Sequence, residues 1–147
     1  MSDGKPVRTY FLGSGRLGIP VVDALLQDSR ISLLGIGSQC DKPYGRRKII
    51  TPTQFCQHVL NRGLEVDRVP SVSSEEFLAK MRSLELDLLI VVAFGQLLRP
   101  ALLGLPKFGC LNVHASLLPK YRGACPIASA LLNGDSETGV CFMKMDK

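Results

Sequence analysis

An asparagine and a histidine two residues apart are the side chains of this sequence best suited to polar chemistry. Asn112 and His114 lie in the run 110–114, whose apolar members predict a β-strand. Alternate residues of a strand point to the same face, so the two side chains project together. An amide N–H beside an imidazole suits an oxyanion, and the imidazole can also carry a proton.

The structural alternative is that His114 is a hydrogen-bonded core histidine and Asn112 a turn residue at the end of the strand. The turn-rich sequence that follows, 116–123, and the position at the strand's C-terminal end favour the functional interpretation. Open α/β sheets bind their ligands at that end.

A glycine-rich turn is a second candidate for a ligand site. Gly13, Gly15 and Gly18 form a G-x-G-x-x-G pattern between a predicted strand and a predicted helix. In dinucleotide enzymes such glycines let the backbone approach a pyrophosphate. No acidic residue ends the second predicted strand, and the nearest, Asp41, lies in a basic loop. The pattern alone leaves two interpretations open: an NAD(P)-binding Rossmann module, or a tight turn that binds no nucleotide.

A cluster of cations lies in the segment 38–48, which is predicted to be a polar loop. The four cations are Lys42, Arg46, Arg47 and Lys48. They suit contact with phosphates, and the alternative is a solvated, mobile loop. The position of the loop directly after the second predicted strand favours phosphate contact.

The elements that must position these residues alternate between strand and helix along the chain. Strands are predicted at 7–12, 31–36, 65–69, 87–93, 110–114 and 140–143. Helices are predicted at 17–27, from an N-cap at Thr51 and Pro52 to about 63, from Ser73 or Ser74 onward, at 100–103 and at 124–132. The unbroken apolar run 87–93 is typical of a central parallel strand. The alternation predicts one α/β domain across 1–147 with a Rossmann-like, doubly wound, mostly parallel sheet.

The composition limits the classes of function. The chain has 147 residues, of which 46% are hydrophobic, and its net charge is +5, which favours anionic partners without choosing between tRNA, phosphates and a polyglutamate tail. Five scattered cysteines without a CxxC pair and two histidines predict neither disulfides nor a metal site. Neither a membrane-spanning run nor a signal peptide is present, so a cytoplasmic protein is expected, with no membrane and no stable protein partner implied.

The stretch 112–123 resembles the signature of the folate-dependent formyltransferases, with Asn-x-His, then Ser-Leu-Leu-Pro, then Arg-Gly. The resemblance covers nearly the whole chain and includes 88–96 and 134–140. The segment 41–48 resembles the basic loop of the methionyl-tRNA branch of the family. The resemblance implies a formyltransferase fold truncated at its C-terminal side, so that 1–147 is an incomplete N-terminal catalytic domain without the C-terminal tRNA-binding domain.

The resemblance also assigns roles to residues. It makes Asn112 and His114 two of three catalytic residues. The third, an aspartate in a Leu-Asp-Thr-Gly motif, is expected a few residues after Asp146, beyond the last residue. The implied folate-binding residues are Ser116, Leu117, Leu118 and Pro119, together with Phe94, Gly95, Gln96 and Leu97 in a loop that lines the pterin pocket. The implied tRNA-binding residues are Lys42, Arg46, Arg47 and Lys48.

The activity that the resemblance implies is transfer of a formyl group from 10-formyltetrahydrofolate to the amino group of initiator methionyl-tRNA. A sugar amine or a ribonucleotide is the alternative acceptor, and the basic loop argues against both. The family places no nucleotide at the glycine turn, which disfavours the NAD(P) interpretation. Without the third catalytic residue, the chain is expected to bind folate weakly and to be an inactive fragment.

Overall fold

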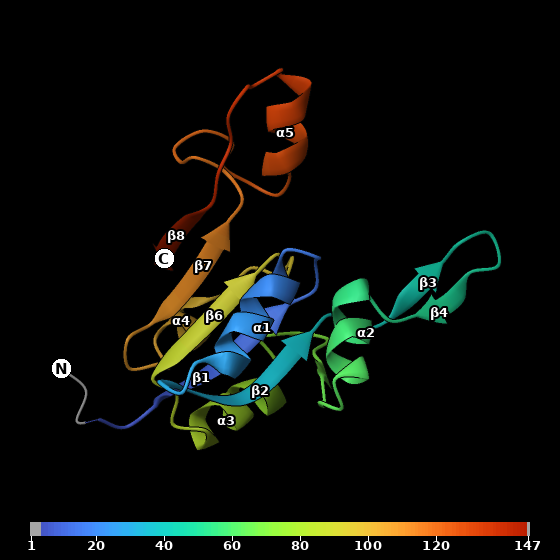
Figure 1. Cartoon of the computed structure of the whole chain (residues 1–147). Helices are drawn as coiled ribbons and strands as arrows, with labels where there is room; N and C mark the ends of the chain where they lie inside the picture. The colour runs from blue at the N-terminus through green and yellow to red at the C-terminus, as the bar shows by residue number, and fades with distance from the viewer. Residues whose placement is uncertain (1–3, 147) are drawn as a thin grey trace.

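A six-stranded sheet forms the centre of the computed structural model, which describes residues 4–146 (Figure 1). The strand order is β5-β2-β1-β6-β7-β8. The sheet strands are β1 (Val7–Gly13), β2 (Ile31–Ser38), β5 (Asp67–Arg68), β6 (Leu88–Val92), β7 (Cys110–His114) and β8 (Cys141–Met145). The helices are α1 (Gly18–Gln27), α2 (Gln54–Asn61), α3 (Glu75–Ser83), α4 (Pro100–Leu103) and α5 (Pro126–Leu132).

The sheet is mostly parallel, as the sequence predicts. β1 pairs in parallel with β2 and with β6, and β6 pairs in parallel with β7. β8 at the edge runs antiparallel to β7. β6, which covers most of the continuous apolar run, lies inside the sheet between β1 and β7. Its last four residues are buried because both faces of the sheet are covered.

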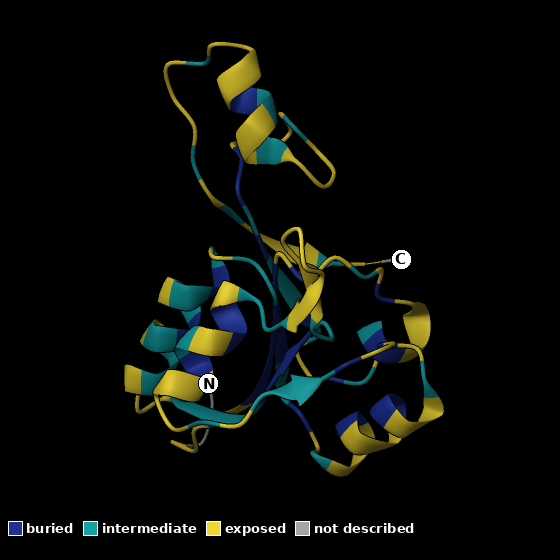
Figure 2. Cartoon of the chain, turned by 90° about the vertical axis from the view of Figure 1, so that its right-hand side faces the viewer, coloured by how far each residue is buried: buried dark blue, intermediate teal, exposed yellow. Residues whose placement is uncertain are grey.

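Each face of the sheet has its own hydrophobic core, because alternate residues of a strand point to opposite sides. Tyr10 and Leu89 pack with residues of α3 and α4 on one face. Phe11 and Ile90 pack with residues of α1 and α2 on the other, where Phe11 stacks on Phe55 at 5.4 Å between ring centroids. Figure 2 shows the buried sheet between helices whose outer sides are exposed. These two layers confirm the doubly wound arrangement.

The basic segment differs from its prediction. It forms a hairpin in place of a loop, with β3 (Lys42–Tyr44) antiparallel to β4 (Ile49–Thr51). The hairpin extends away from the sheet (Figure 1), and every residue from 42 to 50 is exposed. Each strand has three residues and buries neither face, so the sequence lacks the alternation that normally reveals a strand.

The start of α2 is also corrected. Thr51 is the last residue of β4, and the N-cap is Thr53, whose hydroxyl accepts the Cys56 N–H at 3.1 Å. Both threonines flank Pro52, and either is a suitable N-cap residue. Thr51 belongs to the hairpin, which could not be predicted from the sequence, so Thr53 is the N-cap.

The C-terminal part of the fold extends beyond the sheet. α5 begins at Pro126, two residues later than predicted, and Ala130 is its buried residue. β8 covers Cys141–Met145 in place of the predicted 140–143, and Phe142 on it is 72% exposed. β5 is shorter than predicted, with two residues. Figures 1 and 2 show α5 and its loops standing away from the sheet and the helices that cover its two faces. Within residues 4–146, no helix has the length and apolar character needed to cross a membrane.

Candidate active site

Asn112 and His114 lie at the C-terminal end of β7, on the same side of the strand. Asn112 is opposite Val91 of β6 and Met143 of β8, and His114 is opposite Cys141. The strand's alternation places both on the face where Cys110 packs in the core with α3 and α4. Both side chains are half-buried. The edge of the sheet where they lie is the one at which ligands bind in open α/β folds.

The two side chains differ in their hydrogen bonds. Nε2 of His114 lies 2.9 Å from the backbone oxygen of Tyr121. A carbonyl oxygen can only accept, so Nε2 carries the hydrogen and donates it. The amide of Asn112 has no hydrogen-bond partner within residues 4–146. It is therefore available to a ligand.

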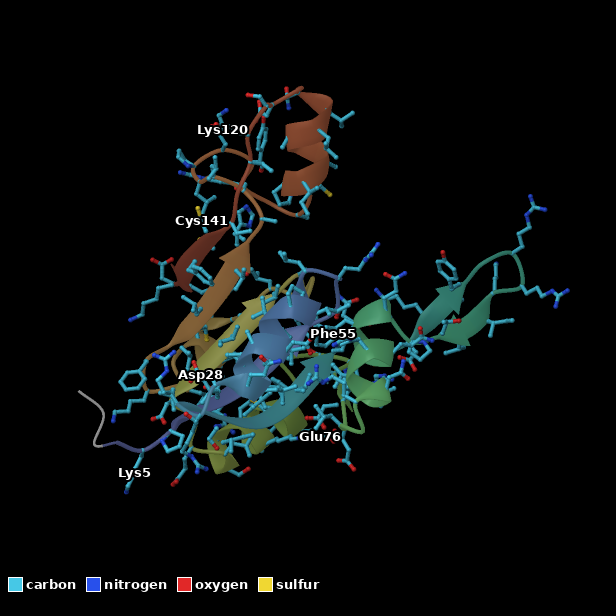
Figure 3. All side chains as sticks on the ribbon, in the orientation of Figure 1. Lys5, Asp28, Phe55, Glu76, Lys120 and Cys141 are labelled. Atoms are coloured by element: carbon cyan, nitrogen blue, oxygen red, sulfur yellow. The ribbon has the colours of Figure 1, made fainter. Side chains whose placement is uncertain are left out.

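The segment 116–119 continues directly from β7. Ser116 is fully buried, and its hydroxyl donates to the Lys120 oxygen at 2.6 Å, so this side chain closes the loop. The N–H of Leu118 donates to Sγ of Cys141 at 3.4 Å, which ties the loop to β8. Leu117 and Pro119 are exposed. Figure 3 shows Lys120 and Cys141 in this upper region of the molecule.

The segment 94–97 follows the neighbouring strand, β6. Phe94 is buried, whereas Leu97 is 82% exposed. Gly95 has a φ of +81°, a conformation that glycine adopts without strain. The side chain of Gln96 bonds to the backbone after β5, accepting from Val72 N at 3.0 Å and donating to the oxygens of residues 69 and 70 at 3.2 and 3.3 Å.

The two segments begin side by side. Val92, the last residue of β6, pairs with Val113 of β7. The segments that follow the two strands therefore leave the sheet at the same end. The structure thus brings the start of segment 94–97 close to Asn112 and His114. Gln39, the residue directly after β2, donates its side-chain N–H to the Phe94 oxygen.

Close packing accounts for the glycine turn. None of Gly13, Gly15 and Gly18 has a positive φ. A Cβ on Gly15 would lie 2.9 Å from Cβ of Ala93, and one on Gly18 would lie 3.1 Å from the Phe55 ring. Within the same turn, Ser14 bonds to the Ser38 hydroxyl at 3.0 Å and accepts Gln39 N–H at 2.9 Å. Tight packing of the strand-to-helix turn therefore accounts for Gly15 and Gly18.

The four cations of the basic hairpin are not equivalent. Lys42, at the start of β3, donates its Nζ to the side-chain oxygen of Gln39 at 2.7 Å. Arg46, Arg47 and Lys48 lie at the exposed tip, and none of them makes an ion pair within residues 4–146. The hairpin starts close behind β2, so a ligand at the sheet edge lies on the same side of the molecule as its base.

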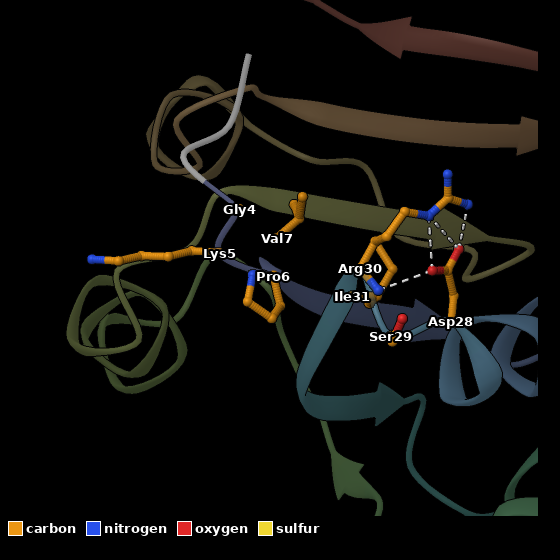
Figure 4. A pocket seen from close by; sticks show the side chains of 8 residues that line it. All are labelled: Gly4, Lys5, Pro6, Val7, Asp28, Ser29, Arg30 and Ile31. Atoms are coloured by element: carbon orange, nitrogen blue, oxygen red, sulfur yellow. Dashed lines mark hydrogen bonds and ion pairs between the residues drawn. The ribbon is translucent and has the colours of Figure 1, made fainter.

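Another surface hollow lies away from these residues. It has a volume of about 490 Å³ and is lined by residues 4–7 and 28–31, before β1 and around the start of β2 (Figure 4). Two of its charged side chains pair with each other: hydrogen bonds from Arg30 lower the pKa of Asp28 to about 2. This hollow lies at the N-terminal ends of the parallel strands, whereas Asn112 lies near the C-terminal end of β7. A hollow of about 370 Å³ adjoins the site and is lined by Leu117, Pro119, Lys120, Asp135, Ser136 and Glu137.

Metal ligands do not gather anywhere in the described chain. Across residues 4–146 no three His, Cys, Asp or Glu side chains come together, and the five cysteines are free. The Cys110 thiol is deep in the core, where burial raises its pKa to about 11.

Comparison with known proteins places this geometry in a family. The family model described as "Formyl transferase" matches residues 7–147. The chain belongs to the formyl transferase family. It is 39% identical over 141 residues to the methionyl-tRNA formyltransferase of Methylacidiphilum infernorum, covering 96% of this chain and 44% of that protein. It is 42% identical over 138 residues to the methionyl-tRNA formyltransferase of Bacillus licheniformis, covering 94% of this chain and 43% of that protein.

Solved structures share the fold. Glycinamide ribonucleotide transformylase 1 from Geobacillus kaustophilus superposes with a TM-score of 0.67 at 24% identity, covering 97% of this chain and 75% of that one. Phosphoribosylglycinamide formyltransferase from Anaplasma phagocytophilum gives a TM-score of 0.72 at 17% identity, covering 97% and 66%. The chain spans less than half the length of the curated relatives named above.

Several contacts at the site have no signal in the sequence. Gln39 reaches Phe94 across 55 positions, and Gln96 reaches Val72 across 24. Tyr121 bonds to Asp135 at 2.7 Å. Each joins segments that only the folded sheet brings together, and no spacing rule predicts them.

Proposed function

We propose that the whole protein transfers a formyl group from 10-formyltetrahydrofolate to the amino group of methionyl-tRNA, for translation initiation. The observation that carries the proposal is the pair Asn112 and His114 on one face at the C-terminal end of β7, with the amide of Asn112 free. Membership of the formyl transferase family supports the reaction class. Relatives 39–42% identical that are named methionyl-tRNA formyltransferases support the acceptor.

The reaction has one demand that Asn112 meets. When an amine attacks the formyl carbon, a new C–N bond forms and negative charge develops on the formyl oxygen. The bond to N10 of the folate then breaks, and N10 leaves as a neutral amine after it takes up the proton that the attacking amine loses. Bound 10-formyltetrahydrofolate supplies the formyl group. The free amide N–H of Asn112 then donates to the oxygen, and this bond strengthens as the charge grows.

His114 adds a second polar group beside Asn112. Its Nε2–H is held by the Tyr121 oxygen, so the proton that His114 exchanges is at Nδ1. The aspartate implied by the family resemblance would assist a protonated imidazole electrostatically.

The exposed leucines at the sheet edge fit a folate. Leu97 and Leu117 present apolar surface on the two segments that leave β6 and β7. A pterin is flat and largely apolar on its faces, and its edge carries donors and acceptors that backbone groups can satisfy. We assign the folate to segments 94–97 and 116–119, in which Ser116 and Gln96 hold the loops and the leucines contact the ring.

The basic hairpin supports tRNA as the acceptor over a sugar amine or a ribonucleotide. Its three tip cations, Arg46, Arg47 and Lys48, extend away from the body and are exposed. A small acceptor needs no cations at that distance, whereas an RNA backbone presents phosphates along its whole length. Of the four cations, Lys42 is the least suited to phosphate contact, because its ammonium group is hydrogen-bonded to Gln39.

The proposal concerns a protein of the length of these relatives, in which residues 1–147 are the N-terminal catalytic region and a further domain holds tRNA. To test it, residues 1–147 are joined to the remaining C-terminal part of the Bacillus licheniformis relative. Formylation of methionyl-tRNA, glycinamide ribonucleotide and a sugar amine is then measured with 10-formyltetrahydrofolate. Preferred formylation of methionyl-tRNA is expected. A folded chimera that formylates only the small acceptors would contradict the tRNA assignment.

A further inference from the structure

The loop after β7 holds the histidine ring through a residue in a disfavoured conformation. Tyr121 has a φ of +55°, in the left-handed region that glycine adopts readily and residues with a Cβ rarely do. Its backbone oxygen is the acceptor for Nε2–H of His114. A tyrosine at such a position requires surrounding contacts that hold it there.

Those contacts are made by the loop that precedes Tyr121 and by the Tyr121 side chain. On the N-terminal side, Ser116 and Lys120 close the loop: the Ser116 hydroxyl bonds to the Lys120 oxygen at 2.6 Å, and Lys120 N–H bonds to the Leu117 oxygen at 3.1 Å. Ser116 N–H also bonds to the His114 oxygen at 3.0 Å, so the loop is fixed to the end of β7.

The side chain of Tyr121 is held by the segment after α5. Its hydroxyl donates to a carboxylate oxygen of Asp135 at 2.7 Å. A phenol is protonated at neutral pH, and this hydrogen bond raises its pKa further. Asp135 is itself fixed, because its N–H bonds to the Ala130 oxygen at 3.1 Å and its carboxylate lies 3.5 Å from Nζ of Lys120.

We propose that Tyr121 and Asp135 are positioning residues for His114: the phenol–carboxylate bond fixes Tyr121, whose carbonyl oxygen holds Nε2–H and leaves Nδ1 as the exchanging nitrogen. The catalytic role of Nδ1 rests on the proposed formyl transfer. The fixed orientation and tautomer of the His114 ring do not depend on it. Nδ1 has no hydrogen-bond partner within residues 4–146.

The histidine content of the chain makes the proposal directly measurable. The sequence has two histidines, and the other, His58, bonds to Asp23 on α1 at 2.9 Å. Nitrogen-15 NMR distinguishes the two neutral tautomers of each ring, and a His58→Gln variant assigns the signals. The spectra are recorded at pH 8.5, about two units above the pKa of a histidine in a model peptide.

In the 147-residue chain, His114 is expected to show one tautomer with hydrogen on Nε2. Tyr121→Phe and Asp135→Ala should each replace it by an exchanging mixture and leave His58 unchanged. Asp135→Asn retains an acceptor oxygen and should preserve the wild-type His114 signals. Tyr10→Phe is the matched control, because it removes a different phenol–carboxylate bond, to Asp67 at 2.5 Å, from the core.

Unchanged His114 signals in both Tyr121→Phe and Asp135→Ala would overturn the proposal, as would an equal change in Tyr10→Phe. In the chimera with the Bacillus licheniformis C-terminal part, Tyr121→Phe should lower kcat about 10- to 100-fold with little change in KM, as loss of orientation does. If the NMR signals respond while no protein formylates any acceptor, the positioning pair stands and the proposed function fails. If formylation occurs while the signals do not respond, the reverse holds.

Discussion

At the scale of single residues, the amide of Asn112 is the group whose state is most informative. It lies on a strand that is paired on both sides, yet its side chain has no partner within residues 4–146. No buried side-chain polar atom of the described residues lacks a partner, so this amide is accessible to solvent. It is a free donor at the end of the sheet where open α/β folds bind ligands.

Replacing Asn112 tests its role in the transition state. In the chimera with the Bacillus licheniformis C-terminal part, Asn112→Ala should lower kcat by about 100- to 1,000-fold, because one lost donor to an oxyanion has that effect. KM should change little, since the bond strengthens only as charge develops. Asn61→Ala, an exposed asparagine at the end of α2, is the control. An equal loss in kcat and affinity for Asn112→Ala would indicate a merely structural residue.

The buried thiol of Cys110 predicts a pH dependence of stability. Burial raises its pKa from 9 to about 11, so the folded state holds the proton more tightly than the unfolded state. The stabilising contribution is complete below about pH 9 and is lost as the pH rises through about 11. Over that window the loss is about 2–3 kcal/mol, from two pKa units. Urea unfolding at pH 8 and pH 11 should show wild type losing more stability than Cys110→Ala, and parallel losses would disprove the assignment.

At the scale of elements, two corrections to the sequence-based predictions share one cause. The hairpin β3–β4 and the true start of α2 lie in the segment 42–54, most of which is exposed. Hydrophobic periodicity reveals elements that bury a face, as in β6, whose run was predicted as a central strand. It carries no information where neither face is buried. The antiparallel direction of β8 could not be predicted from the sequence either, because strand periodicity is the same in both directions.

The cap of α2 provides a test of the corrected boundary. Thr53→Ala removes the acceptor for Cys56 N–H and should lower the free energy of unfolding by about 1 kcal/mol. Thr51→Ala removes a hydroxyl that bonds locally to Ile49 and should cost less than about 0.5 kcal/mol. Chemical denaturation of both variants measures the difference. A larger cost at Thr51 would mean that the helix begins where the sequence alone suggested.

The hairpin tip predicts a salt-dependent contact. In the chimera, Arg46→Ala should weaken tRNA binding and reduce the slope of log K against log salt by about one, as loss of one phosphate contact does. Arg82→Ala on α3, an exposed arginine paired with Glu75 at 2.6 Å, should leave the slope unchanged. Filter binding at several salt concentrations measures both. Equal slopes for wild type and Arg46→Ala would show the tip to be merely solvated.

At the scale of the whole molecule, the sequence predicted the sheet class and the place of the site together. Asn112 and His114 were predicted to share a face at a strand end, and the structure confirms both statements. That segments 94–97 and 116–119 belong to one site was implied by the resemblance, whereas the neighbouring positions of β6 and β7 are known only from the structure. The contacts of Gln39, Gln96 and Tyr121 were not predictable, because each depends on how strands order themselves within the sheet.

The central claim is that the edge formed by β6 and β7 binds a formyl-folate. Its most direct test is calorimetric titration of the 147-residue chain with a 10-formyltetrahydrofolate analogue and, separately, with NADH. Leu97→Asp places a charge on the segment assigned to the pterin, and Leu132→Asp places one on α5; both leucines are more than 80% exposed, so neither change should disturb the core. The account predicts weak folate binding that Leu97→Asp abolishes and Leu132→Asp preserves, with no binding of NADH. Binding of NADH without binding of the folate analogue would contradict it.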